Sequence, residues 1–463
     1  MTQNTIPSSE NQIGITFREA FWVWVRVAIY SFGGPAGQMA VMHKILVEEK
    51  RWVSEDRFLH ALNFTMLLPG PEAQQLATYL GWLLHNTRGG LIAGSLFVLP
   101  GFISILGLSI LYAGFQEVTI VQALFYGLKP AVMAVVVEAV FRIGRRALKG
   151  RIMYLIAAVA FIAIFFFNTP FPLIVLLAGL LGFMGGKYWF GAFDVIRAAK
   201  VGQAPHHEAV APLISDQIIP HTQPSGKRAF RVVVIGLVLW FTPITILLIA
   251  FGGQDIFVNI GLFFSKTAVV TFGGAYSVLA YIAQQAVDVY GWLQPGQMLD
   301  GLGMAETTPG PLIQVVQFVG FMAAYQNPGY LSPMLAGVYA SLLTTWVTFV
   351  PCFLWIFLGA PYIEQLRGNK SLSTALSTIT AAVVGVILNL AVWFSLQTIF
   401  GEVKRVTYGS LQLQIPDWDT IDLASLTIAI AAFVALFRYK TGMITTLAGS
   451  ALVGLAYYLF FIG

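Results

Sequence analysis

SFGGPAGQ at residues 31–38 and LPGPEAQQ at residues 68–75 are the two stretches that decide the fold. Both interrupt apolar segments with glycine and proline. Proline removes a backbone N–H and disfavours helix in the residue before it, and glycine lets the chain reverse. We therefore expect one helix to end at Gly33 and Gly34 and a second to break at Pro69-Gly70-Pro71. Because Pro71 suits the first turn of a new helix, the next N–H groups would be exposed at a helix N-terminus.

The same motifs return 240 residues later. Phe32-Gly33-Gly34 recurs as Phe272-Gly273-Gly274. Pro69-Gly70-Pro71 recurs as Pro309-Gly310-Pro311, which Thr308 precedes. Two further identities keep the spacing, because Trp52 matches Trp292 and Gln74 matches Gln314. Several motifs at one offset indicate an internal duplication.

The composition places this duplication in a membrane. Of 463 residues, 57% are hydrophobic and only 10% are charged, whereas soluble domains carry roughly 25% charged residues. Apolar runs recur at lengths near the roughly 20 residues that a membrane-spanning helix needs. The sequence thus predicts an all-α integral membrane protein, with the lipid bilayer as a partner and about 13 transmembrane helices. It excludes a water-soluble enzyme.

Charge in the loops predicts how the two copies are oriented. The loop at 142–151 holds five basic residues and no acid, which is typical of the cytoplasmic side, whereas its counterpart at 396–422 has a surplus of acids. The copies should therefore have inverted topology, with a cytoplasmic N-terminus and a periplasmic C-terminus. We divide the chain into a polar tail (1–13), a first membrane repeat (14–189), a cytoplasmic linker (190–228), an extra inverting helix (229–251) and a second membrane repeat (252–463).

Inverted repeats with broken helices are the architecture of many secondary transporters, whose substrate sites lie between the repeats. The helix N-termini at the two Pro-Gly-Pro motifs carry partial positive charge and would bind an anion. Arg26 and Lys266 occupy matching places in the two repeats, which adds two cations and predicts a site for a small dianion. Two structural alternatives stay open: the motifs can be kinks that allow close helix packing, and Arg26 can snorkel or pair with Glu72.

Glu72 lies on the predicted anion-binding helix end. As a carboxylate it would repel a substrate anion, and when protonated it would leave the helix end free. We therefore expect Glu72, or else Glu306, to couple anion movement to protons, although Glu72 can equally cap its own helix. The complete predicted substrate site is Arg26, Gly33, Gly34, Pro35, Gln38, Pro69, Gly70, Pro71, Glu72, Ala73, Gln74, Gln75, Lys266, Gly273, Gly274, Thr308, Pro309, Gly310, Pro311 and Gln314.

Other classes of function find little support in the sequence. No nucleotide-binding, zinc-peptidase or nucleophile-elbow motif lies in a supportive context, so we expect no enzyme, no catalytic or metal-binding residue and no cofactor. The net charge of +5 resides mostly in loops, where it sets topology, so no nucleic-acid partner is expected. A passive anion channel stays an alternative, since broken helices also line pores.

The quoted motifs, SFGGPAGQ at 31–38 and LPGPEAQQLA at 68–77, resemble the signature stretches of the chromate transporter family. The motifs in the second half look like that family's C-terminal copy, so the resemblance covers about residues 15–462. It implies a bacterial inner-membrane protein that exports chromate and confers resistance, driven by the proton gradient or the membrane potential. Sulfate or another oxyanion is an open alternative because it has similar charge and shape, and a homodimer is left open.

Overall fold

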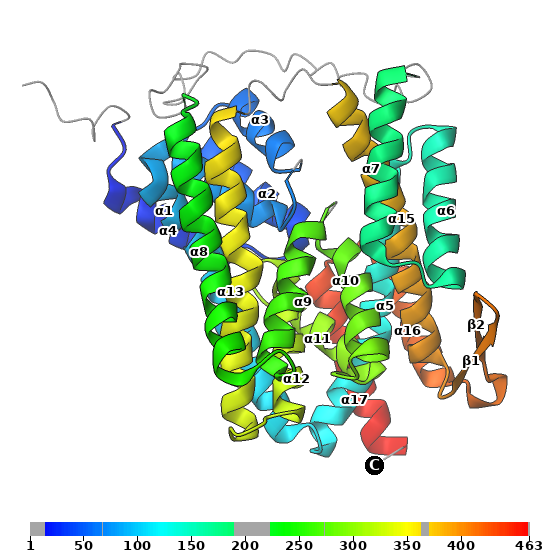
Figure 1. Cartoon of the computed structure of the whole chain (residues 1–463). Coiled ribbons are helices and arrows are strands. Elements are labelled where there is room, and N and C mark those ends of the chain that lie inside the picture. Colours follow the sequence, from blue (N-terminus) through cyan, green and yellow to red (C-terminus); the bar gives the residue numbers. More distant parts are fainter. Residues whose placement is uncertain (1–13, 67, 189–222, 273, 363–369, 462–463) are drawn as a thin grey trace, which may run out of the picture.

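The computed structural model of the chain describes residues 14–66, 68–188, 223–272, 274–362 and 370–461. The predicted N-terminal tail, most of the predicted linker, and Gly273 lie outside these residues. Within them the structure is helical apart from one β-hairpin and an isolated bridge (Figure 1).

The described residues of the first half form seven α-helices and one π-helical turn. In order these are α1 (Phe17–Tyr30), α2 (Gly34–His43), η1 (Lys44–Glu49), α3 (Glu55–Thr65), α4 (Glu72–Phe115), α5 (Thr119–Ala147), α6 (Arg151–Phe167) and α7 (Phe171–Tyr188). Helix α8 (Gly226–Phe251) then leads into the second half.

The second half repeats this order of elements. It contains α9 (Ile256–Val270), α10 (Ala275–Gln284), η4 (Gln285–Val289), α11 (Pro295–Thr307), η5 (Leu312–Gln314), α12 (Val315–Gln326), α13 (Pro333–Gly359), η6 (Ala360–Tyr362), α15 (Lys370–Ile399), β1 (Val403–Tyr408), β2 (Leu411–Pro416), η7 (Trp418–Thr420), α16 (Leu423–Phe437) and α17 (Met443–Phe461).

Matching elements begin and end about 240 residues apart up to the helix breaks. Helices α1 and α9 correspond, as do α2 and α10, and each pair is followed by a π-helical turn, η1 or η4. Trp52 and Trp292 follow these turns, and each is 3% exposed. Beyond the breaks, α4 corresponds to α12 with α13, and α5, α6 and α7 correspond to α15, α16 and α17 by their order.

Corresponding helices run in opposite directions. In Figure 1, α7 ends at the upper edge of the molecule, whereas its counterpart α17 ends at the C-terminus on the lower edge. Likewise α15 runs downward to the hairpin, while α5 runs upward from the lower edge. In these two pairs, each helix thus runs antiparallel to its counterpart.

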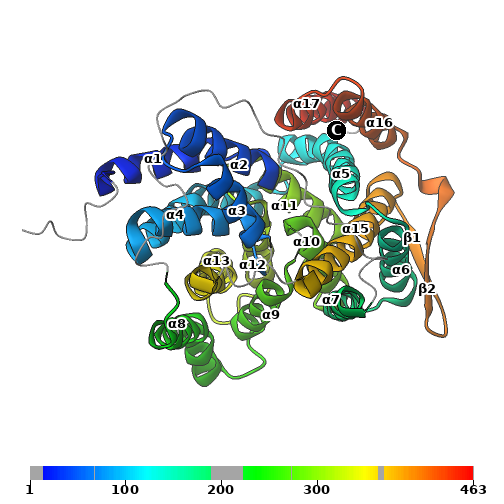
Figure 2. The same ribbon diagram turned by 90° about the horizontal axis from the view of Figure 1, so that it is seen from above.

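The halves are also interlocked. Helix α15 of the second half packs against α6 and α7 of the first, and α5 of the first packs against α16 and α17 of the second. These helices form one side of the molecule when it is seen from above (Figure 2). Small residues allow the close approach, as membrane helices require: a methyl group on Gly127 would lie 2.2 Å from the Ser450 carbonyl oxygen, and one on Gly182 would lie 1.9 Å from Thr378 Oγ1.

Seven of the described helices are long and apolar enough to cross a membrane: α4, α5, α7, α8, α13 (with η6), α15 and α17. Four shorter apolar helices accompany them, and α1 has only 14 residues. At 1.5 Å per residue such a helix is about 21 Å long, less than the roughly 30 Å of a hydrocarbon core. The expected count of about 13 crossings stays a prediction.

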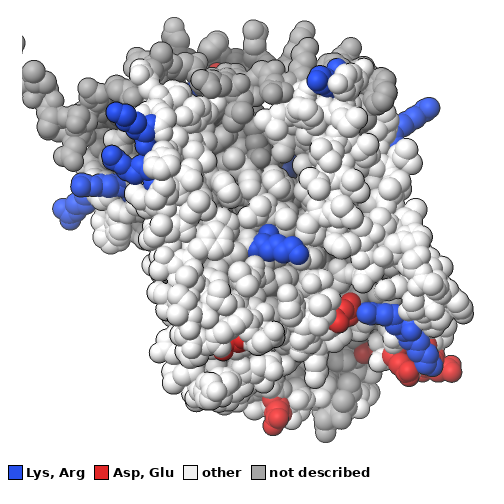
Figure 3. Space-filling view, viewed as in Figure 1, with Lys and Arg blue, Asp and Glu red and all other residues white. Residues whose placement is uncertain are grey.

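The hairpin of β1 and β2 is an element that the all-α prediction did not contain. The alternation of apolar and polar residues in β2, and Gly409 at a φ of +62°, suit a short antiparallel pair with a tight turn. Lys404 Nζ donates a hydrogen bond to Asp417 at 2.9 Å, which raises the pKa of Lys404 and lowers that of Asp417. On the face in Figure 3, most acidic side chains lie in the lower half, where the hairpin is, and most basic ones lie above.

Candidate functional site at the two helix breaks

The two Pro-Gly-Pro motifs lie between helices. Helix α3 ends at Thr65 and α4 begins at Glu72; α11 ends at Thr307 and η5 begins at Leu312. Gly70 and Gly310 have φ values of +123° and +98°, in a region that side chains with a Cβ rarely adopt. We call residues 31–34, 68–72, 271–272, 274 and 308–312 the break cluster.

Each break is hydrogen-bonded to the residue that directly follows the first helix of the other half. The Gly70 N–H donates to the Thr271 carbonyl oxygen at 2.8 Å, and the Gly310 N–H donates to the Ser31 carbonyl oxygen at 2.9 Å. Since 31 and 271, like 70 and 310, are 240 residues apart, the two bonds are symmetry-related. The breaks therefore meet at the interface between the halves, although they are far apart in sequence.

The long helices close the same interface from both sides. A methyl group on Gly70 would lie 2.9 Å from Cys352 Sγ in α13, and one on Gly101 in α4 would lie 2.9 Å from the Pro309 carbonyl oxygen. Gly101 directly follows Pro100 inside α4, and Cys352 directly follows Pro351 inside α13. Gly101 and Cys352 were not predicted as part of the site, and the proline that precedes each of them was the signal that could have indicated them.

Buried amide side chains surround the break cluster. Gln38 donates to the Gly310 carbonyl oxygen at 2.5 Å, and Gln75 donates to the Pro69 carbonyl oxygen at 2.7 Å. Gln74 and Gln314 are fully buried beside them, and Gln317, which the sequence analysis missed, donates to Phe102. The amide oxygens of Gln38, Gln74, Gln75 and Gln314 have no hydrogen-bond partner among the described residues.

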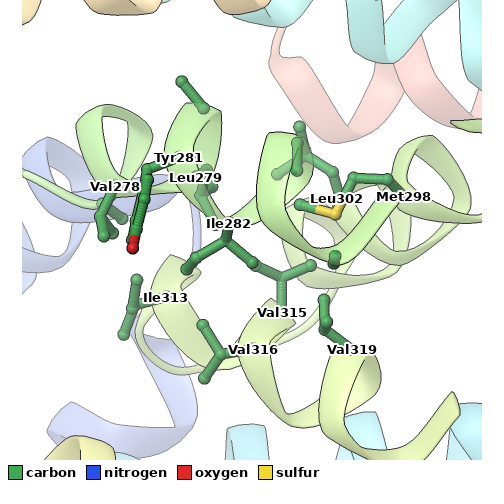
Figure 4. Packing of buried hydrophobic residues seen from close by; sticks show 14 of the residues in the cluster. Val278, Leu279, Tyr281, Ile282, Met298, Leu302, Ile313, Val315, Val316 and Val319 are labelled. Carbon is green, nitrogen blue, oxygen red and sulfur yellow. The ribbon is translucent and has the colours of Figure 1, made fainter. Parts of the chain in front are cut away.

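The two helix N-termini differ in polarity. Neither Pro71 nor Pro311 caps its helix with a side-chain hydrogen bond. The first helix continues with Glu72, which is partly exposed, and the buried Ala73 and Gln74. The second starts with Leu312 and Ile313, and Figure 4 shows Ile313 near Val278 and the neighbouring apolar residues of α10 and α12. The start of α4 is thus polar, and its counterpart in the second half is apolar.

The predicted cations lie elsewhere. The Arg26 guanidinium forms an ion pair with Glu49 at 2.7 Å, and its side chain is 47% exposed. Lys266 is exposed on α9, with its ammonium 5.7 Å from the centre of the Tyr281 ring. The structure therefore brings together the predicted Gly, Pro and Gln residues that it describes. Gly33, Gly34, Pro35 and Gly274 lie beside them at the starts of α2 and α10. Among the described residues, neither Arg26 nor Lys266 contacts the break cluster.

Glu306 and Tyr276 form a buried pair next to the second break. The Tyr276 hydroxyl donates to Glu306 Oε1, and Glu306 is 2% exposed. Its Oε2 has no hydrogen-bond partner among the described residues. Tyr276 directly follows the start of α10, at a position where the first half has Ala36. Glu306 was predicted as a candidate coupling group, but this tyrosine was not.

The sequence model of the chromate transporter family matches residues 18–183 and 258–455. The chain belongs to the chromate transporter family. The match has one part in each half and leaves α8 outside both, so the family pattern includes both Pro-Gly-Pro breaks and the helices that contact them.

Two chromate transport proteins match most of the chain. A chromate transport protein of Cupriavidus metallidurans is 24% identical over 445 residues, which are 96% of this chain and 94% of that protein. A chromate transport protein of Pseudomonas aeruginosa is 30% identical over 375 residues, 81% of this chain and 80% of that protein. An uncharacterised transporter of Bacillus subtilis is 28% identical over 134 residues, which are 29% of this chain but 68% of that protein. No solved structure matches the chain.

Proposed function

We propose that this protein is a secondary transporter that exports chromate across the bacterial inner membrane and so confers chromate resistance. The names of its full-length relatives support chromate as the substrate. The observation that carries a transport mechanism is the reciprocal pair of hydrogen bonds that joins each helix break to the opposite half. Two inverted halves that meet at such breaks can exchange conformations, so that a site between them opens to either side in turn.

The break cluster has the chemistry that a tetrahedral oxyanion requires. Uncapped helix N-termini supply N–H groups and partial positive charge. Rotation of the Gln74 amide by 180° would turn its NH2 group, in place of the unpartnered oxygen, toward an anion. Because the start of α4 is polar and the start of η5 is apolar, we place the anion nearer to Pro71 than to Pro311.

The orientation follows from the charges. We place the upper edge of Figure 1 in the cytoplasm, because the basic loop 142–151 lies between α5 and α6 there, and the acidic hairpin region in the periplasm. The N-terminus is then cytoplasmic and the C-terminus periplasmic. We propose inverted-topology repeats on the same ground, supported by the antiparallel course of α7 and α17.

Two parts of the predicted site stay predictions. Glu72 would couple transport to protons by competing with the anion for the start of α4. Arg26 and Lys266 would supply positive charge, although each has another partner in the structure. Replacement of both by alanine should abolish oxyanion flux. Normal flux in this double variant would contradict a two-cation site.

The proposed function is tested by tracer flux in proteoliposomes that contain the full chain. We expect chromate to accumulate against its gradient when a proton gradient or a membrane potential is imposed. Sulfate is measured in parallel as the competing substrate, and faster sulfate flux would reassign the substrate. Rapid passive conductance without accumulation would identify a channel, and no flux of either anion would contradict the proposal.

A further inference from the structure

A second polar site lies away from the break cluster, where α5 meets α11. Asp300 of α11 is 3% exposed. Its Oδ2 accepts a hydrogen bond from the Tyr112 hydroxyl of α4 at 2.9 Å. Its Oδ1 lies 3.5 Å from Lys129 Nζ of α5 and has no hydrogen-bond partner among the described residues. Three helices thus place a buried carboxylate with one unsatisfied oxygen beside a single ammonium group.

This cluster forms part of the wall of a cavity of about 340 Å³. The other lining residues come from the ends of α4, α5, α15, α16 and α17: Gln116, Val121, Gln122, Phe125, Tyr126, Gln397, Thr398, Asp422, Ser425 and Tyr458. These helix ends lie toward the lower edge of Figure 1, which we place in the periplasm. Water from that side can therefore fill a polar space of this size next to Lys129 and Asp300.

The charges of the cavity suit a proton better than an oxyanion. The described residues of its wall include one cation, Lys129, and two acids, Asp300 and Asp422. Asp422 is fully bonded, because it accepts from the Tyr126 hydroxyl at 2.7 Å, from two N–H groups at the start of α16 and from Ser425 Oγ. A dianion entering the cavity would meet a net negative wall. Asp300 is the acid whose bonding leaves room for a proton.

We propose that Asp300, held by Lys129 and Tyr112, takes up and releases the coupling proton on the periplasmic side. This inference rests on the proposed transport function, but it makes Asp300 the coupling group in place of Glu72 and assigns the proton a route apart from the anion. The titratable and charged groups that line the space around Asp300 are Tyr112, Lys129, Tyr126, Asp422 and Tyr458. A proton arriving from the cavity binds Oδ1, neutralises the carboxylate and removes its attraction for Lys129.

Protonation of Asp300 can affect the second break, because α11 leads directly into it. Asp300 and Glu306 lie on this helix, and α11 ends at Thr307, directly before Thr308-Pro309-Gly310-Pro311. The helix packs closely on α5, since a methyl group on Gly303 would lie 2.6 Å from Leu128. While Asp300 is ionised, its attraction for Lys129 holds α11 to α5. Protonation weakens this hold, so that α11 and the break can move together.

The test uses Asp300→Asn and the double variant Lys129→Met with Asp300→Asn, which leaves no uncompensated buried charge. Glu117→Gln is the matched control, because Glu117 is an exposed acid at the same edge that does not line the cavity. Purified full-length protein in liposomes is assayed in two ways. Exchange of labelled for unlabelled chromate is measured without a gradient, and chromate accumulation and internal pH are measured under an imposed pH gradient.

We expect both Asp300 variants to exchange chromate like the wild type but to lose proton-driven accumulation and the coupled pH change. With a gradient of one pH unit, the loss is about tenfold in accumulation per coupled proton. Glu117→Gln should keep both activities. Accumulation retained by the variants would overturn the proposal, as would loss of exchange in folded protein, which would place Asp300 in the anion path.

Each of the remaining outcomes also supports or contradicts the proposal. If neither neutral variant folds, Asp300→Glu, which keeps the acid, should retain proton coupling with a shifted pH profile, and an unchanged profile would contradict the role of Asp300. Accumulation driven by sodium instead of protons would overturn the assignment of the ion. If the wild-type protein exchanges chromate but its chromate accumulation does not depend on the proton gradient, this inference alone is refuted. If the wild-type protein moves no oxyanion, the proposed function is refuted.

Discussion

Gly70 and Gly310 are the residues on which the geometry of the breaks depends most directly. Each combines a positive φ with a backbone hydrogen bond to the other half. A methyl group on Gly310 would lie 3.0 Å from the Cα atom of Gly101, so the space is closed as well. Backbone strain and close contact therefore act together at both positions.

We predict that Gly70→Ala and Gly310→Ala each lower stability by about 1–3 kcal/mol and reduce chromate flux, because alanine disfavours the required φ. Thermal unfolding of the purified protein in detergent and flux in proteoliposomes measure the two effects. Gly107→Ala is the control, since a methyl group there meets no atom within 4 Å. Wild-type unfolding and flux in either break variant would show that these glycines are replaceable.

The proposed role of Glu72 predicts how transport should change with pH. If its carboxylate competes with the anion for the start of α4, transport falls as the pH rises through the pKa of Glu72, because ionisation then repels the substrate. In Glu72→Gln the side chain stays neutral, so flux at high pH should equal flux at low pH. The pH profile of chromate exchange measures this, with Glu117→Gln as the control. An unchanged profile in Glu72→Gln would rule out Glu72 as the coupling group.

At the scale of elements, small residues decide how the two halves interlock. Gly127 lies in α5 of the first half, against α17 of the second. We predict that Gly127→Ala destabilises the protein by about 1–3 kcal/mol, because the new methyl group overpacks this contact. Gly449→Ala in α17 should be harmless, since nothing lies within 4 Å of the added group. Equal unfolding temperatures of the two variants would contradict the close packing of α5 and α17.

Elements differ in how well the sequence predicted them. The motifs at Gly33–Gly34 and Pro69–Pro71 predicted where helices end, because glycine and proline act on their own backbone. The hairpin at 403–416 was not predicted, because its strands have only six residues and β1 does not alternate apolar and polar residues. Asp300 was missed as well, because its partners Tyr112 and Lys129 lie more than 170 positions earlier in the chain.

For the whole molecule, the orientation in the membrane can be tested with single cysteines. Cys352 is 1% exposed and free, so the natural background of labelling should be low. We predict that an impermeant maleimide labels Asp419→Cys in intact spheroplasts and labels Lys149→Cys only after lysis, because the hairpin region is periplasmic and the basic loop cytoplasmic. Both replaced residues are exposed. The reverse pattern would invert the proposed topology.

The sequence by itself determined the membrane class, the duplication, the family and the places where helices break. These properties depend on composition and on local backbone chemistry, which each segment carries with it. Only the tertiary structure decided that each break bonds to the opposite half, that Arg26 pairs with Glu49, and that Asp300 meets Lys129 beside a cavity. Such contacts join residues distant in sequence, and they depend on how interlocked helices pack, which periodicity and charge do not encode.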